Sequence, residues 1–433
     1  MKKIKLTISC LVILSLITIG FLPSVQSIEN KNTILSTDET IIEMIQQINK
    51  PLVSRYLNSL IDFGPRYTGS QNCENAGDFI YEEFQKMDLD VEFHEWSFQG
   101  FKSRNIVATL EGNDLSSNAI FIMSAHYDCT PGSLGADDDA SGVAAMMAAA
   151  NIMSKYSFNH TIRFIAFSGE EVGTYGSYLY ARDAYKNEDN IVAVLNADMV
   201  GYADSTEGGK TIRFFHENRA SWIAEYAITI SEKYYDIVDM MVEDMPNYKG
   251  SDHQAFTYYG YDAVWIAHHD GYKWSNSPDD TPDHLNFTYL TKASKILLAV
   301  LSELAIRPIN VQVVFKTPLE GYRHIFNRKK ELPITIGRKW YWGMRGITVI
   351  FGTTMAKVEV ISNEEIDHVI FCIDDNFIAW DSEPPYEWYI EGKVIPPMGR
   401  HKLQVYAYTK SGDVAFDEMD ILIFSYQYQY RKF

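Results

Sequence analysis

One imidazole and several carboxylates occur directly after hydrophobic runs of this sequence. His126 and Asp128 follow the apolar run 119–123, and the same pattern recurs twice further along the chain. The acidic residues concerned are Asp137, Asp138, Asp139, Glu170, Glu171 and Asp198. Several buried carboxylates that converge repel one another unless a cation joins them. A set of one imidazole and carboxylates without a thiolate suits catalytic zinc, and it also permits manganese or cobalt.

Each acidic cluster also has an ordinary structural interpretation. The carboxylates of 137–139 could cap a helix that begins near Ser141, because a helix N-terminus favours negative charge. The pair 170–171 could be a solvated helix start, and Asp198 could be a turn residue. All three interpretations would have to hold together at successive strand ends, so the metal site is the favoured interpretation.

The elements that position these residues alternate between short apolar runs and helical stretches. Helical spacing of apolar residues predicts helices within 40–63 and over 76–87. The predicted strands are Asn105–Leu110, Ala119–Ala125, Thr161–Ser168, Ile191–Met199, Arg213–His216 and Ala263–Ala267. Strands separated by helices indicate an α/β domain over 40–306, with a mostly parallel central sheet flanked by helices. Ligands of such sheets bind beyond the carboxyl ends of the strands, where the acidic clusters fall.

The character of the chain changes after Pro308. Alternating apolar and polar residues, separated by turn clusters, predict many short strands. The clearest strand runs are Val311–Phe315, Lys357–Ile361, His368–Cys372 and Leu403–Tyr408. We therefore predict an all-β domain over 309–433, an antiparallel sandwich of the immunoglobulin-like type.

The motifs of the first domain together resemble the co-catalytic zinc aminopeptidase family, whose relatives include glutamate carboxypeptidase and glutaminyl cyclase. The resemblance covers about 57–304 and implies the zinc exopeptidase fold. The motifs that carry it are Gly64-Pro-Arg66, Ser103-Arg-Asn105, His126-x-Asp128, the Asp-rich turn before Ser141-Gly142, Ser168-Gly-Glu-Glu171, Asn196-Ala-Asp198 and Ser251-Asp-His253.

The resemblance implies a role for each matching residue. The implied metal ligands are His126 and Asp198 for one ion, Glu171 for a second ion and Asp138 as the bridge between the two ions. Glu170 would be the general base, and Asp128 would orient His126. The same resemblance implies a cis peptide bond between Asp138 and Asp139.

One position departs from the family pattern. Asn276 stands where the family has its last metal-ligating histidine, and an amide oxygen is a weaker zinc ligand than imidazole. Three outcomes follow from this departure: substitution by His268, His269 or His284; one tightly held ion with a second, exchangeable one; or loss of activity, which would leave a binding protein with a peptidase fold. A single-metal cyclase is disfavoured, because the resemblance places its metal at Asp138, Glu171 and the missing histidine.

The N-terminal segment and the composition of the chain limit where the protein can be located and which partners it can have. Lysines, an apolar run and small residues over 1–27 predict a secretory signal peptide, with an uncleaved signal anchor as the alternative. A net charge of -19 disfavours nucleic acid as a partner. Cys73 and Cys129 could form a disulfide in an exported protein, although buried free thiols are the favoured interpretation.

The sequence as a whole predicts a secreted or cell-surface zinc exopeptidase. The expected reaction is hydrolysis of the N-terminal residue of peptides or proteins with free N-termini. The C-terminal domain has no catalytic constellation, so we expect it to serve spacing, substrate contact or attachment to the cell surface.

Overall fold

The computed structural model describes most of the chain after residue 35. The described residues are 36–115, 117–217, 220–246, 250–307, 311–318, 323–325, 334–336, 348–352, 354–362, 364–390 and 399–424. The predicted signal segment 1–27 lies outside them. Within the described part of the chain, no helix has both the length and the apolar character needed to cross a membrane.

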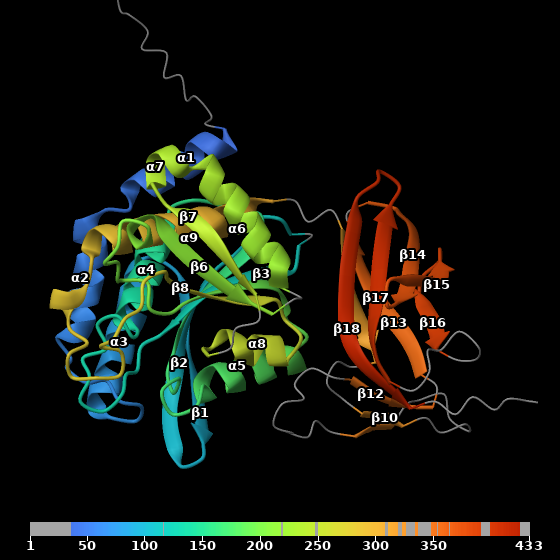
Figure 1. The fold of residues 1–433 in the computed structure, drawn as a ribbon, viewed down its shortest axis with the longest axis horizontal. Helices are drawn as coiled ribbons and strands as arrows, with labels where there is room; N and C mark the ends of the chain where they lie inside the picture. Colours follow the sequence, from blue (N-terminus) through green and yellow to red (C-terminus); the bar gives the residue numbers. More distant parts are fainter. Residues whose placement is uncertain are drawn as a thin grey trace, which may run out of the picture.

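The first part of the chain forms an eight-stranded mixed sheet with helices on both faces (Figure 1). Its strands are β1 (Asp90–Phe98), β2 (Phe101–Leu110), β3 (Ala119–His126), β4 (Thr161–Phe167), β5 (Asn190–Ala197), β6 (Thr211–His216), β7 (Met241–Pro246) and β8 (Ala263–His268). The spatial order is β1-β2-β4-β3-β5-β8-β6-β7. The central strands β4, β3, β5 and β8 are mutually parallel, whereas β1–β2, β2–β4 and β8–β6 are antiparallel pairs.

The helices divide between the two faces of this sheet. They are α1 (Thr37–Gln47), α2 (Lys50–Ile61), α3 (Gln71–Lys86), α4 (Ala140–Met153), α5 (Tyr175–Lys186), α6 (Ser221–Lys233), α7 (Tyr235–Val238), α8 (His253–Tyr258) and α9 (Phe287–Ile306). The larger hydrophobic core contains residues of α1–α4, α6 and α9, and the smaller core contains residues of α5 and α8 (Figure 1). Phe121 and Met123 of β3 point into the larger core and Ile120 and Ile122 into the smaller one. The strand is therefore buried on both faces, as its continuous apolar run predicts.

The β-rich region that follows forms two further sheets with a core of their own. Their strands are β9 (Val311–Thr317), β10 (Arg323–Ile325), β11 (Ile334–Ile336), β12 (Thr348–Phe351), β13 (Thr354–Ser362), β14 (Ile366–Ile373), β15 (Asn376–Asp381), β16 (Glu387–Ile390), β17 (Gly399–Thr409) and β18 (Val414–Phe424). The sheet orders are β11-β10-β12-β18-β17-β14-β15 and β16-β13-β9. Most pairings are antiparallel, as predicted, but β12 pairs in parallel with β10 and with β18. The immunoglobulin-like type stays a prediction.

Candidate metal centre

The predicted site residues gather at the carboxyl ends of three neighbouring strands. His126 is the last residue of β3, Asp198 follows β5 directly, and Glu170 and Glu171 lie in the turn between β4 and α5. Because β4, β3 and β5 are parallel neighbours, their carboxyl ends meet at one edge of the sheet. The interpretation of Glu170-Glu171 as a helix start is wrong, since α5 begins only at Tyr175.

His126 is oriented so that one ring nitrogen faces carboxylates. Its Nδ1 lies 3.1 Å from the backbone carbonyl oxygen of Asp128, which can only accept, so Nδ1 carries a proton. Its Nε2 is buried and has no hydrogen-bond partner among the described residues. Carboxylate oxygens of Asp138 and Asp198 lie 3.3 and 3.6 Å from this Nε2. A buried imidazole nitrogen that faces two carboxylates has the chemistry of a metal ligand.

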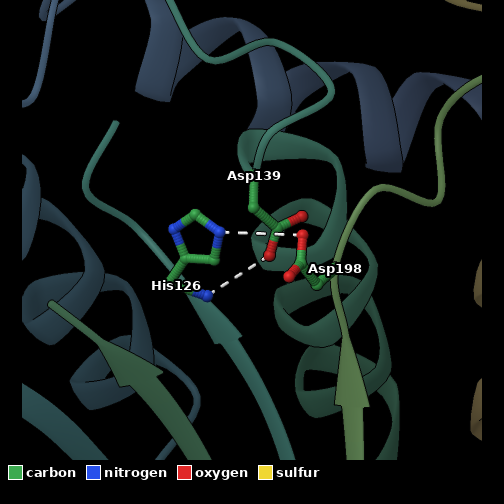
Figure 2. A group of neighbouring side chains, drawn as sticks. All are labelled: His126, Asp139 and Asp198. Atoms are coloured by element: carbon green, nitrogen blue, oxygen red, sulfur yellow. Dashed lines mark hydrogen bonds and ion pairs between the residues drawn. The ribbon is translucent and has the colours of Figure 1, made fainter. Parts of the chain in front are cut away.

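Asp139 lies close to this group but serves the backbone. Ligand atoms of His126, Asp139 and Asp198 all lie within 4.8 Å of one another (Figure 2). The Asp139 carboxylate accepts hydrogen bonds from the backbone N–H groups of His126, Gly142 and Met199, at 3.2, 2.8 and 3.1 Å. Both of its oxygens are therefore used, and Asp139 is the N-cap of α4, so the capping interpretation is confirmed for this residue.

Gly142 at the start of α4 permits this close arrangement. A Cβ atom at position 142 would collide with the backbone carbonyl oxygen of Ala197 at the end of β5. The absence of a side chain at position 142 lets α4 begin directly against β5. This brings residues 137–139, which precede α4, close to Asp198, which follows β5.

Asp138 is held in front of His126 by its neighbours. Its peptide bond to Asp139 is cis, as the family resemblance implies. The backbone N–H groups of Asp137 and Asp138 donate to the carboxylate of Asp280, at 2.9 and 3.1 Å. The second oxygen of Asp138, Oδ2, accepts a hydrogen bond from the Ser275 hydroxyl at 2.7 Å. The role of Asp280 was not predicted from the sequence.

A chain of hydrogen bonds inside the sheet positions Asp198. The Ser251 hydroxyl donates to Asp198 Oδ2, and the Asn196 side-chain amide donates to Ser251 Oγ at 2.8 Å. Ser124 on β3 completes the chain with a hydrogen bond to Asn196 Oδ1 at 2.8 Å. All four residues are buried. Asn196 and Ser251 belong to the motifs of the family resemblance, and these hydrogen bonds supply a physical reason for their presence.

The carboxylate of Asp128 holds the turn that carries Glu170 and Glu171. Its oxygens accept the backbone N–H groups of both glutamates at 3.3 Å and the Thr68 hydroxyl at 2.6 Å. The same carboxylate lies 3.6 Å from Nδ1 of His126. Asp128 thus contacts His126 mainly through its carbonyl oxygen, while its side chain links the histidine strand to the glutamate turn.

Burial and mutual repulsion dominate the proton equilibria of the site in the absence of an ion. Burial raises the pKa of Glu170 well above its ordinary value, and it raises the pKa of Glu171, which also faces Asp138, to about 8. Burial, reinforced by Asp198, likewise raises the pKa of Asp139. Burial opposes protonation of His126, but the nearby carboxylates of Asp128, Asp138 and Asp198 outweigh it and raise the pKa of the imidazole. A divalent cation would relieve this repulsion and displace the imidazole proton.

Asp252 is a further buried carboxylic acid of this region. No role was assigned to it from the sequence. Its Oδ1 accepts a hydrogen bond from the Ser177 hydroxyl, and its Oδ2 has no partner among the described residues. Burial raises its pKa to about 7, and its charge in turn raises the pKa of Glu170. Its place within the Ser251-Asp-His253 motif was the only sequence signal for it.

Asn276 does not join the carboxylates. The residue is exposed, has a φ of 59°, and its side-chain nitrogen lies 3.2 Å from the Ser275 hydroxyl oxygen. Each histidine that could replace the missing imidazole has another partner. His268 bonds to Asp137 at 2.9 Å, His269 bonds to Asp270 at 3.1 Å, and His284 stacks on Trp274 with ring centroids 3.9 Å apart.

Arg66 supports the loop before the aspartates from within the core. The residue is fully buried, and its guanidinium group donates to the carbonyl oxygens of Tyr127, Leu134 and Gly135 at 2.8, 2.7 and 3.1 Å. Its backbone N–H lies 3.0 Å from the sulfur of Cys129. Arg66 therefore fixes both ends of the loop that leads from His126 to Asp137.

The substitution Arg66→Met is expected to lower the free energy of unfolding by about 3 kcal/mol or more, because several buried carbonyl groups would lose their donor. Urea unfolding of the purified chain measures this change. Arg55→Ala is the control, because Arg55 forms a half-exposed ion pair with Glu83 and its loss should cost less than about 1 kcal/mol. Equal effects of the two changes would contradict the structural role of Arg66.

The three cysteines of the described part are free. Cys73, Cys129 and Cys372 are all buried thiols. A Cys73–Cys129 disulfide is therefore excluded in this structure, and the interpretation as buried free thiols is confirmed. Burial raises the pKa of each thiol, which keeps the three cysteines in the weakly reactive thiol form.

The fold and the buried histidine–carboxylate cluster define an α/β domain of the zinc aminopeptidase type. Residues 105–301 match the model of Peptidase family M28. Over these residues the α/β part of this chain is therefore similar to peptidases of family M28.

Two further comparisons, with named relatives and with solved structures, find the same similarity to zinc aminopeptidases and metalloproteases. The chain is 26% identical over 292 residues to leucine aminopeptidase 1 of Phaeosphaeria nodorum, covering 62% of this chain and 74% of the relative. It is 30% identical over 215 residues to a probable zinc metalloprotease of Leptosphaeria maculans, covering 43% and 50%. The LapA aminopeptidase structure of Legionella pneumophila superposes with a TM-score of 0.57 at 23% identity, covering 63% of this chain and 76% of that one. The zinc aminopeptidase BSAP of Bacillus subtilis gives 0.53 at 18% identity, covering 60% and 96%.

Proposed function

We propose that this chain is a zinc-dependent aminopeptidase that removes N-terminal residues from peptides. The observation that carries the proposal is the buried, unpartnered Nε2 of His126, which faces carboxylate oxygens of Asp138 and Asp198. These three residues would hold the ion. Histidine and carboxylate ligands without a thiolate are typical of catalytic zinc sites, and they also accept manganese or cobalt.

When bound, the ion supplies a Lewis acid that polarises the scissile carbonyl and lowers the pKa of a water molecule. Glu170 is then the general base that takes the proton of this water and gives it to the leaving amine. Burial raises the pKa of Glu170 above its ordinary value, which favours proton uptake by this carboxylate. Asp128 would position Glu170 for this role, because its carboxylate accepts the backbone N–H of Glu170.

The substrate class is proposed from the relatives. Several relatives are named leucine aminopeptidases, which supports peptides and proteins with free N-termini as substrates. We further propose export, with the C-terminal β region providing association with the cell surface. The net charge of -19 supports a non-nucleic-acid substrate.

The test is hydrolysis of a panel of aminoacyl-arylamides with varied side chains by the full chain. We expect turnover that a chelator abolishes and added zinc restores. The matched control is the same panel with the α-amine acetylated, which an aminopeptidase should leave intact. If no compound of the free-amine panel were hydrolysed in a chelator-sensitive way, the proposal would be wrong, and equal cleavage of the acetylated panel would point to another exopeptidase mode.

The second candidate is a binding protein with an impaired peptidase site. Its motivation is Asn276, which is exposed and lacks the imidazole that the family places there. This candidate requires negligible turnover by the natural chain and a strong gain from Asn276→His. Fast turnover by the natural chain would exclude it.

A further inference from the structure

We propose that the metal centre of this chain holds one ion, and that the Ser275 hydroxyl takes the place of the second ion at the free oxygen of Asp138. The proposal rests on the proposed function, because it specifies the composition of the same site. It concerns a difference between this chain and the two-metal pattern that the family resemblance implies.

The two oxygens of the Asp138 carboxylate have different surroundings. Oδ1 lies 3.3 Å from Nε2 of His126, on the side of the first ion. Oδ2 accepts a hydrogen bond from Ser275 Oγ at 2.7 Å. A carboxylate that bridges two ions needs one oxygen for each ion. Here the second oxygen already accepts a hydrogen bond from a neutral donor, which occupies one of its lone pairs without a cation.

Asn276 reinforces this arrangement. Its side-chain nitrogen lies 3.2 Å from Ser275 Oγ, so the amide can donate to the hydroxyl while the hydroxyl donates to Asp138. The two residues form a short chain of hydrogen bonds that ends on the carboxylate. The amide nitrogen is thus occupied by Ser275, and the amide oxygen that remains is a weaker zinc ligand than imidazole.

The described residues offer too few ligands for a second zinc ion. Glu171 supplies one buried oxygen without a partner among the described residues, and Asp138 Oδ2 is already bonded to Ser275. His268 contacts Asp137 through Nε2 and keeps an Nδ1 without a partner in the described part of the chain, while His269 contacts Asp270 and His284 stacks on Trp274. Among the described residues, none of the three forms a hydrogen bond or ion pair with Asp138 or Glu171. Zinc sites usually take three or four protein ligands, so two carboxylate oxygens give only weak binding.

Metal stoichiometry tests the proposal independently of turnover. The purified full chain is freed of metal, loaded with excess zinc and dialysed, and its zinc content is measured by mass spectrometry. Titration with cobalt, followed by its visible absorption, gives a second measure. We expect one tightly bound ion for the natural chain and two for Asn276→His, with Asn276→Gln as the matched control that stays at one.

Ser275→Ala should lower the affinity for the single ion by about 10- to 100-fold, because Asp138 would lose the partner that orients it. Ser277→Ala is its control, since Ser277 donates to the Trp274 carbonyl within the same turn. Two tightly bound ions in the natural chain, or one ion in Asn276→His, would overturn the single-ion proposal while leaving the proposed function intact. A chain that binds no zinc would overturn both proposals.

Discussion

Glu170→Gln is expected to lower kcat by about 10²- to 10⁴-fold while the zinc content stays unchanged. Glutamine keeps the volume and the backbone contact of this turn to Asp128, but it cannot accept the proton of the attacking water. The measurement is steady-state hydrolysis of the best arylamide together with metal analysis of the same sample.

The control for this change is Glu74→Gln, since Glu74 is exposed on α3 and is not one of the residues that form the site. It should leave kcat unaltered. A Glu170→Gln variant that kept more than about a tenth of the natural kcat would fall outside the range of general-base catalysis and would remove Glu170 from that role.

His126→Ala is expected to lose the ion and to lower kcat/KM by at least about 10³-fold. A bound metal contributes several kcal/mol of charge stabilisation in the transition state, and about 4 kcal/mol corresponds to about 10³-fold in rate. Removing the imidazole leaves Asp138 and Asp198 as the nearest ligands, without the nitrogen that fixes the ion between them. Zinc content after dialysis and arylamide hydrolysis measure the two effects.

The matched control is His160→Ala. His160 is also buried, but it precedes β4 and bonds to Ser117, at the end of the sheet opposite the site. Its loss should affect stability and leave zinc content at the natural level. If both variants lost zinc equally, the effect would reflect general unfolding instead of ligand removal.

The strands that carry the site could be predicted because they are buried on both faces. β3, β4 and β5 appear in the sequence as continuous apolar runs, and each predicted run corresponds to an observed strand. The edge strands β1 and β7 were missed. Most of their side chains are exposed or only partly buried, so their sequences lack the apolar continuity that marks a central strand.

The candidate site could also be predicted only in part: features set by neighbouring residues in the sequence were predicted, whereas contacts between distant segments were not. Spacing within the chain placed the chemical residues at strand ends, and the family resemblance implied the cis bond between Asp138 and Asp139 that the structure contains. It could not show that Asp280 binds the amides of residues 137 and 138, because this contact joins segments far apart in the sequence. The orientation of Asn276 was equally hidden, since it depends on the left-handed backbone of its turn.

The three hydrogen bonds of Asp139 have a consequence for metal exchange. One carboxylate ties the end of β3, the first turn of α4 and the residue after Asp198 into a single unit. The spacing between the proposed ligands is thus set by the backbone before any ion arrives. It follows that an ion can leave and another can enter without refolding of the domain. The metal that the protein carries would then be decided by supply and by the preference of one imidazole and two carboxylates, with no contribution from the energy of folding.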